Sequence, residues 1–137
     1  MNCTHNAYIY FLVILTAPSF RYEPENITAQ PVNGVATAAF SCAVSPIADL
    51  VQIQWQYEMM SFGSGMSGIG PGPMPGILSN DSESGVTIIQ PADPGTSILV
   101  LDSVGNEHEG LYSCVAAFSD GTMITSSQAS LTYHGKL

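Results

Sequence analysis

The residues with which catalysis or metal binding would begin are histidine, cysteine and serine, and in this chain they are scattered. The histidines His5, His108 and His134 are dispersed, and none stands at a zinc-ligand spacing from a cysteine. Serines are frequent, but no signature of a nucleophile with its base and orienting group surrounds them. We therefore expect no catalytic residues and no enzyme. A rate of hydrolysis above background on generic esters or glycosides would favour the opposite hypothesis, that the chain is an enzyme.

One glycine-rich segment matches a cofactor pattern. Residues 63–68, Gly-Ser-Gly-Met-Ser-Gly, fit G-x-G-x-x-G, which in dinucleotide-binding proteins holds a pyrophosphate where a helix begins. Gly70 and Pro71 follow directly, with two more prolines after them, and these residues prevent that helix. We attribute the match to glycine-rich composition and predict no cofactor.

An acidic stretch could supply oxygen ligands to calcium. Asn80, Asp81 and Glu83 lie close together in the sequence, but the EF-hand spacing is absent. Exposed acidic loops are common in proteins without metal ions. We favour a solvated loop over a calcium site and predict no metal ligands.

The residues Gly110, Tyr112 and Cys114 form the pattern G-x-Y-x-C, and Cys42 and the sole tryptophan, Trp55, precede them. In this order they resemble the immunoglobulin superfamily, over roughly residues 24–133. The resemblance implies an all-β fold, an immunoglobulin-like Greek-key β-sandwich with one inter-sheet disulfide. It further implies that Cys42 pairs with Cys114, that Trp55 packs on this bridge, and that the Tyr112 hydroxyl turns to backbone at a corner.

Two features depart from the patterns of that superfamily. The resemblance predicts an aspartate at His108, often paired with an arginine that this chain lacks near residues 86–90. Residues 127–133 lack the F-G-x-G bulge of antigen-receptor variable domains, so an antibody or T-cell-receptor chain is not expected. The Ala-x-Leu-x-Tyr ending looks like intermediate-type domains, whereas the long cysteine separation looks like variable-type domains.

Alternation of apolar and polar residues predicts which side chains enter the core. From Val51 to Glu58 every odd position is apolar and every even position is polar, which indicates a strand with one buried face. The same parity directs six further side chains inward: Phe40, Val44, Leu99, Leu101, Ala116 and Phe118. Strands are expected at 35–45, 50–58, 86–90, 97–102, 111–118 and 123–133, after a kinked edge strand within 21–33.

The length of 137 residues suits one domain behind a leader. An apolar run at 7–15 has the length of a signal-peptide core and is too short to span a bilayer, so we expect a signal peptide at 1–19. A mis-called gene start is the alternative. The domain is then 20–134, with a flexible Gly/Pro-rich insertion at 60–85 and a tail at 135–137. The tail contains no membrane span and no lipid-anchor signal.

Charge restricts the partners. The chain has 2 basic and 11 acidic residues and a net charge of −9. Such a chain should be repelled by nucleic acid and by anionic membranes. Solubility of a secreted protein explains the charge adequately, and attraction to a basic protein partner is the alternative.

Residues that alternate with the predicted core form a candidate partner-binding face. The resemblance implies that the two strands that contain them share a sheet, so this face would be flat, nearly uncharged and partly apolar, which suits a protein partner, homophilic or heterophilic. The alternative is a solvated sheet. The candidate residues are Gln52, Gln54, Gln56, Val115 and Ala117, and Ile98 and Val100 form a second candidate patch.

These observations together favour an extracellular binding module for protein–protein recognition, in cell adhesion or as a receptor ectodomain. A disulfide-bonded cysteine pair is typical of an oxidising compartment. Asn26 and Asn80 each begin a glycosylation sequon. A soluble secreted ligand or decoy is the alternative, which a longer transcript encoding a membrane span would exclude.

Overall fold

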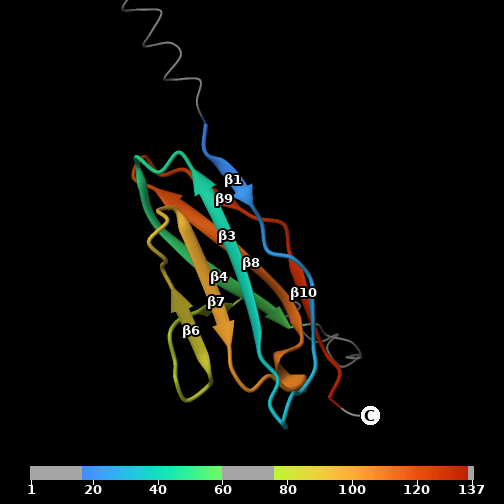
Figure 1. Ribbon diagram of the computed structural model, residues 1–137. Coiled ribbons are helices and arrows are strands. Elements are labelled where there is room, and N and C mark those ends of the chain that lie inside the picture. Colours follow the sequence, from blue (N-terminus) through green and yellow to red (C-terminus); the bar gives the residue numbers. More distant parts are fainter. Residues whose placement is uncertain (1–16, 60–75, 136–137) are drawn as a thin grey trace, which may run out of the picture.

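The computed structural model describes residues 17–59 and 76–135. Within them the chain forms two packed β-sheets, as the resemblance implied (Figure 1). The four-stranded sheet has the order β1 (Ser19–Tyr22), β3 (Ala38–Ser45), β7 (Thr96–Leu101) and β6 (Val86–Ile89). The six-stranded sheet has the order β2 (Ile27–Ala29), β10 (Ala129–Tyr133), β8 (Gly110–Phe118), β4 (Leu50–Met59) and β5 (Gly76–Leu78), and β9 (Met123–Thr125) also pairs with β8.

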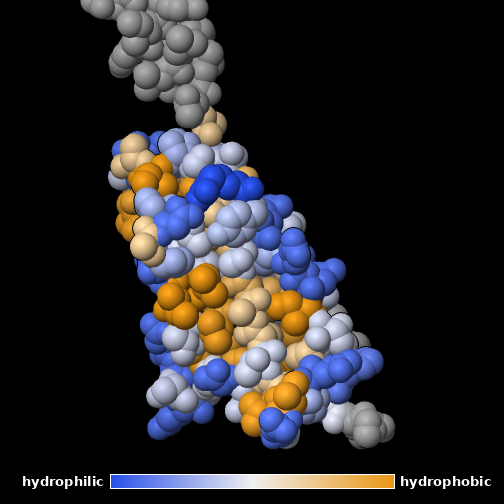
Figure 2. All heavy atoms as spheres, viewed as in Figure 1, coloured by the Kyte–Doolittle hydropathy of each residue, from blue (hydrophilic) through white to orange (hydrophobic). Residues whose placement is uncertain are grey.

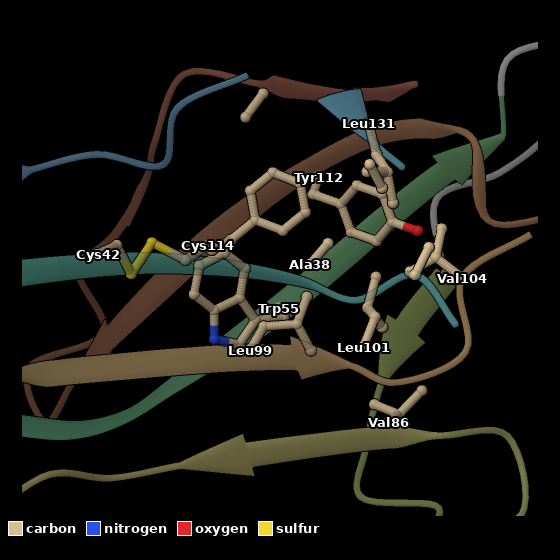
Figure 3. Close-up of a cluster of buried hydrophobic side chains, with 14 residues drawn as sticks. Ala38, Cys42, Trp55, Val86, Leu99, Leu101, Val104, Tyr112, Cys114 and Leu131 are labelled. Carbon is tan, nitrogen blue, oxygen red and sulfur yellow. A yellow bond between two sulfur atoms is a disulfide. The ribbon is translucent and has the colours of Figure 1, made fainter. Parts of the chain in front are cut away.

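The core contains the residues that the sequence predicted. Cys42 and Cys114 form a disulfide between the sheets, and both are fully buried (Figure 3). Trp55 is also fully buried, and its Nε1 donates a hydrogen bond of 2.9 Å to Ser97 Oγ. The predicted inward residues of β3, β7 and β8 all belong to the buried clusters: Phe40, Val44, Leu99, Leu101, Tyr112, Ala116 and Phe118.

The first strand changes sheet at a proline. β1 pairs antiparallel with β3, whereas β2 pairs parallel with β10 in the other sheet. The buried Pro24 lies between them, and because proline has no N–H it cannot continue a ladder. This confirms the predicted kink. Ser19 is part of β1 although the predicted signal peptide ends there; residues 1–16 lie outside the described chain.

Val51 does not follow the predicted alternation along β4. It is 62% exposed, although its parity placed it in the core. The pairing of β4 with β8 shifts register between Leu50 and Gln52, which lie opposite Phe118 and Ala117. Such an irregularity removes one residue from the ladder and turns it outward. From Gln52 onward the predicted parity is confirmed, because Ile53 and Tyr57 pack against the core.

The strand expected to begin at Val35 begins three residues later, at Ala38. Val32 and Val35 instead exchange backbone hydrogen bonds of 2.7 and 3.2 Å across a tight turn. Asn33 and Gly34 in this turn have φ values of 59° and 84°. Asn-Gly is the residue pair that adopts such angles most readily, so the local turn takes precedence over the strand.

The predicted continuous strand at 123–133 is divided into β9 and β10. Between them the Ser126 N–H donates to the Cys114 carbonyl at 2.9 Å, and Ser126 Oγ accepts from the Cys114 N–H at 3.0 Å. The hydroxyl thus replaces a backbone carbonyl in the ladder. β9 pairs with Val115–Ala117 of β8, and β10 continues toward β2.

Part of the predicted insertion at 60–85 is regular structure. Residues 60–75, including the G-x-G-x-x-G match, lie outside the described chain. Residues 76–78 form β5, which pairs with β4 so that Leu78 lies opposite Trp55. The turn that follows is held by Asp81, whose backbone N–H and carbonyl both bond Val86 at 2.9 Å.

Candidate functional site

The predicted partner-binding residues lie together on the outward surface of β4 and β8, and β5 and β9 extend this surface on either side. We call the surface made by these four strands the outer face. It points away from the disulfide and Trp55, because its residues alternate with theirs. The register arranges it in lateral rows: Gln52, Ala117 and Met123; then Gln54, Val115 and Thr125; then Ile77, Gln56 and Ser113.

Exposure on the outer face differs from the sequence expectation at Val115. Its side chain is only 4% exposed and offers a partner little surface, since it lies between Gln54 and Thr125 of the neighbouring strands. Well-exposed apolar side chains are instead Met123, at 63%, and Ile77, at 57%, together with Val51, at 62%, which the irregularity in β4 turns outward.

Sequence reasoning did not select Met123 and Ile77. The alternation that begins after the turn at Asp120 would have identified Met123. Ile77 carried no such signal, because the glycine- and proline-rich residues before it conceal a three-residue strand.

Charge is sparse on the outer face. Within the described residues of its strands, Glu58 is the outward-facing residue that carries a charge. Its Oε1 accepts a hydrogen bond of 3.0 Å from Gln128 Nε2. This leaves amides, two hydroxyls and apolar groups over the three rows, a composition that resembles the core of a protein–protein interface.

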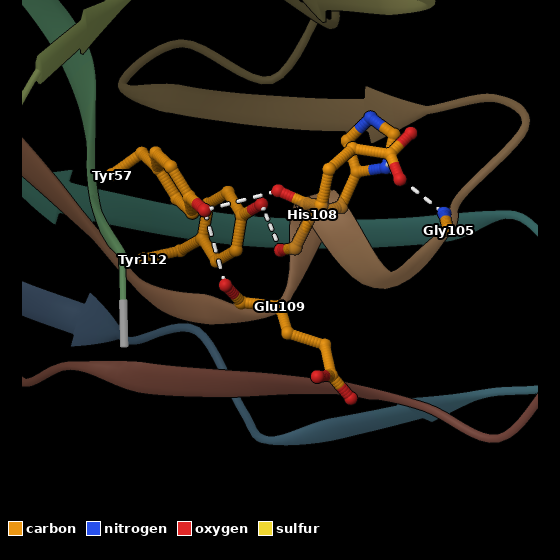
Figure 4. Close-up of polar contacts among 6 residues, drawn as sticks. Tyr57, Gly105, His108, Glu109 and Tyr112 are labelled. Carbon is orange, nitrogen blue, oxygen red and sulfur yellow. Dashed lines mark hydrogen bonds and ion pairs between the residues drawn. The ribbon is translucent and has the colours of Figure 1, made fainter. Parts of the chain in front are cut away.

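Several hydrogen bonds hold the turn that precedes β8, at one end of the sandwich (Figure 4). The Tyr112 hydroxyl donates to the His108 carbonyl at 2.6 Å, which confirms the predicted role of this tyrosine. The Tyr57 hydroxyl lies 3.0 Å from the Glu109 carbonyl. His108 takes the place of the aspartate that the resemblance predicts, and its Nδ1 accepts the Gly105 N–H at 2.9 Å. In this bond the neutral ring carries its proton on Nε2.

We predict that Tyr112→Phe lowers the free energy of unfolding by about 1–3 kcal/mol, because the His108 carbonyl loses its donor. Burial, and then the nearby Tyr57, raise the pKa of Tyr112. A tyrosine in the unfolded chain ionises at about pH 10. Above that pH the unfolded state therefore binds fewer protons than the folded state, in which Tyr112 is still protonated. Stability from this group is therefore complete below about pH 10 and lost as the pH rises further.

Urea unfolding of the parent chain and the Tyr112→Phe variant between neutral and strongly alkaline pH measures this difference. Above about pH 10 the parent's free energy of unfolding should fall more steeply than the variant's, by up to about 1.4 kcal/mol per pH unit. Identical slopes would contradict the assignment of a buried, protonated Tyr112.

The second predicted patch lies on the opposite sheet. Ile98 and Val100 are partly buried on β7, where Ile98 lies between Ser41 and the exposed Ile89, and Val100 lies beside Ala39. Figure 2, viewed from the side of this sheet, shows hydrophobic surface over β7 and its neighbours. A partner for this patch stays a prediction.

Both sequon asparagines are exposed and use their side-chain oxygens in hydrogen bonds. Asn26 Oδ1 accepts the Ser130 N–H at 2.8 Å, and Asn80 Oδ1 accepts the Ile88 N–H at 2.6 Å. A glycan is attached to the amide nitrogen, so these oxygens remain acceptors in a glycosylated chain. Their glycosylation stays a prediction.

Neither a metal centre nor a membrane span is found in the part of the chain that the structure describes. No group of three histidine, cysteine, aspartate or glutamate side chains there could hold a metal ion. The same residues contain no helix long and apolar enough to cross a membrane.

No family model and no curated protein matches this sequence. Solved structures do match, among them the crystal structure of the titin domains Z1Z2 in complex with telethonin, at 21% identity and a TM-score of 0.59. That match covers 88% of this chain and 49% of the other, so this chain spans about half its length. A chimeric titin Z1Z2 functionalized with a KLER exogenous peptide from decorin matches at 20% identity and a TM-score of 0.58, over 88% of this chain and 97% of the other. These likenesses show an immunoglobulin-like fold.

Proposed function

We propose that this chain is an extracellular immunoglobulin-like binding module that recognises a protein partner through the outer face, in cell adhesion or as part of a receptor ectodomain. The observation that supports it most is the composition of that face. Met123 and Ile77 expose more than half of their surface, and Glu58 is its charged residue among those described. Interface cores are depleted of charge in this way.

Two further observations support the proposal. The disulfide between Cys42 and Cys114 forms and persists in oxidising compartments such as the extracellular space. One of the similar structures, titin Z1Z2, is in complex with telethonin, so a protein of this fold binds a protein partner there.

The test is a binding screen of the purified chain against purified cell-surface and secreted ectodomains, with the chain itself among them. Sedimentation velocity measures self-association. We expect at least one saturable partner, whose affinity falls about tenfold or more in both Met123→Glu and Met123→Lys, because either charge would be buried at the contact.

The matched controls are Val32→Glu and Val32→Lys, at a turn residue that is 71% exposed and lies outside the outer face. These variants should bind like the parent. A chain that binds no ectodomain and remains a monomer would contradict the proposal. So would a partner whose affinity is the same for the parent and both Met123 variants.

A further inference from the structure

A pocket of about 360 Å³ lies at the side of the sandwich that is formed by the edge strands β5 and β6. β5 is the last strand of one sheet and β6 is the last strand of the other, so no further strand covers this side within the described residues. Leu78 lines the pocket from β5, Val86 from β6, Leu101 from β7 and Tyr57 from β4. We call this the β5–β6 pocket.

The floor of the β5–β6 pocket is apolar and continuous with the core. Leu101, Tyr112 and Val86 line it and are 1%, 2% and 8% exposed, and all three belong to the main core cluster. Leu78 also packs against that cluster. The accessible apolar surface of the pocket comes from Leu78, which is partly exposed, and from Ile77, and the buried side chains lie directly beneath it. Such a lining favours an apolar group, because it removes that group from water.

The mouth of the pocket is acidic. Asp81 and Glu107 line it, and both are exposed. The Asp81 carboxylate accepts hydrogen bonds from the Ser84 hydroxyl at 2.7 Å and the Glu83 N–H at 3.1 Å. These bonds, that of the Ser84 hydroxyl first, lower the pKa of Asp81.

No lysine or arginine of the described residues balances these carboxylates, and His108 Nδ1, which lies 3.6 Å from Glu107 Oε2, accepts the Gly105 N–H instead of donating to the carboxylate. Neither lysine nor arginine lines the pocket, and Arg21 lies elsewhere, 3.4 Å from Asp93. A neighbouring hollow that shares Glu107 adds the carboxylates of Glu83 and Asp102. The negative electrostatic potential at the mouth therefore favours a ligand with a cationic group at the mouth and an apolar group in the pocket.

Resting on the proposed function, we propose that the β5–β6 pocket receives an apolar side chain of the protein partner, flanked by arginine or lysine residues that pair with Asp81 and Glu107. The apolar anchor fills the floor, and the basic groups remain at the mouth. Ile77 connects this pocket to the outer face, because it lines the pocket and lies in one row with Gln56. One partner can thus contact both surfaces.

The probe is the peptide acetyl-Arg-Leu-Arg-amide, titrated to millimolar concentration into the whole chain with labelled methyl groups. We expect saturable shifts of the methyl resonances of Leu78, Val86 and Leu101. The peptide acetyl-Glu-Leu-Glu-amide should not bind, and acetyl-Arg-Gly-Arg-amide, which lacks the anchor, should bind at least several-fold more weakly. Equal binding of the three peptides, or no saturable shift at the floor, would overturn the proposal.

Glu107→Lys tests the mouth of the pocket without disturbing its floor, because the Glu107 side chain is 74% exposed. It should weaken the peptide about three- to tenfold, as expected for reversing one exposed charge pair. Glu25→Lys makes the same charge change at an exposed site outside this pocket, and it should leave the affinity close to that of the parent. An equal effect of both variants would show attraction by net charge alone and overturn the pairing.

The two proposals fail separately. If Met123→Glu abolishes binding of a partner but the peptide does not bind the floor, the outer face stands and the pocket assignment is wrong. If the peptide binds as expected but no ectodomain depends on Met123, the pocket assignment stands and the outer face is wrong.

Discussion

A chain in which both Cys42 and Cys114 are replaced by alanine is expected to lose about 4 kcal/mol of its free energy of unfolding. The disulfide joins residues separated by 72 positions, and without it the unfolded chain gains the entropy that this loop withholds. A domain of this size has only about 5–15 kcal/mol of stability, so the loss is a large share of the total. Urea unfolding followed by far-UV circular dichroism measures it.

The parent chain with its disulfide reduced is the matched control, because it lacks the bridge but keeps both sulfur atoms. It should lose nearly as much stability as the double variant. A double variant within about 1 kcal/mol of the oxidised parent would contradict the expected contribution of the bridge. Free alkylation of Cys42 and Cys114 in the native protein would show that the bridge does not form.

Replacing Trp55 by alanine is expected to cost about 3–5 kcal/mol. The side chain is fully buried, and it lies directly opposite Cys114 on one neighbouring strand and Leu78 on the other. Phe40 packs beside it with a distance of 6.5 Å between ring centroids. Removal of the indole leaves a cavity between the sheets and also deprives Ser97 Oγ of its donor, the Trp55 Nε1–H.

The variants Trp55→Phe and Ser97→Ala separate the hydrogen bond from the packing. In the parent, Ser97→Ala leaves a buried indole N–H without an acceptor and should cost about 1–3 kcal/mol. In the Trp55→Phe background the same change should cost much less, because that donor is already absent. Circular dichroism replaces fluorescence as the measurement, since the variants that carry Trp55→Phe lack the sole tryptophan. Equal costs in both backgrounds would show that the hydrogen bond contributes nothing.

Several parts of the fold were predictable from the sequence because their signals are local. The spacing of Tyr112 and Cys114, and the alternation around Trp55, assign side chains to one face or the other of a strand. Pro24 interrupts its strand for a covalent reason, the missing N–H. The resemblance to immunoglobulin domains added the pairing of Cys42 with Cys114, which the structure confirms.

The outer face was predictable in outline and not in detail. Gln52, Gln54 and Gln56 lie on it as alternation requires. The burial of Val115 depends on its neighbours across two strand pairings, and a single strand's sequence contains no information about them. The division of the last strand at Ser126 could not be predicted either. It depends on a hydrogen bond between the Ser126 hydroxyl and the N–H of Cys114, which lies 12 residues earlier on another strand.

In the sequence, residue type and a two-residue period indicated the parity of the principal strands, and the resemblance to immunoglobulin domains implied the fold class and the buried cysteine pair. Three features arise from the tertiary structure: the irregularity at Val51, the strand β5 beside Trp55, and the β5–β6 pocket with Asp81 at its mouth. Each of these requires side chains or backbone groups from segments far apart in the chain to meet. The distances between these groups depend on how the two sheets pack on each other, and no local sequence pattern encodes that packing.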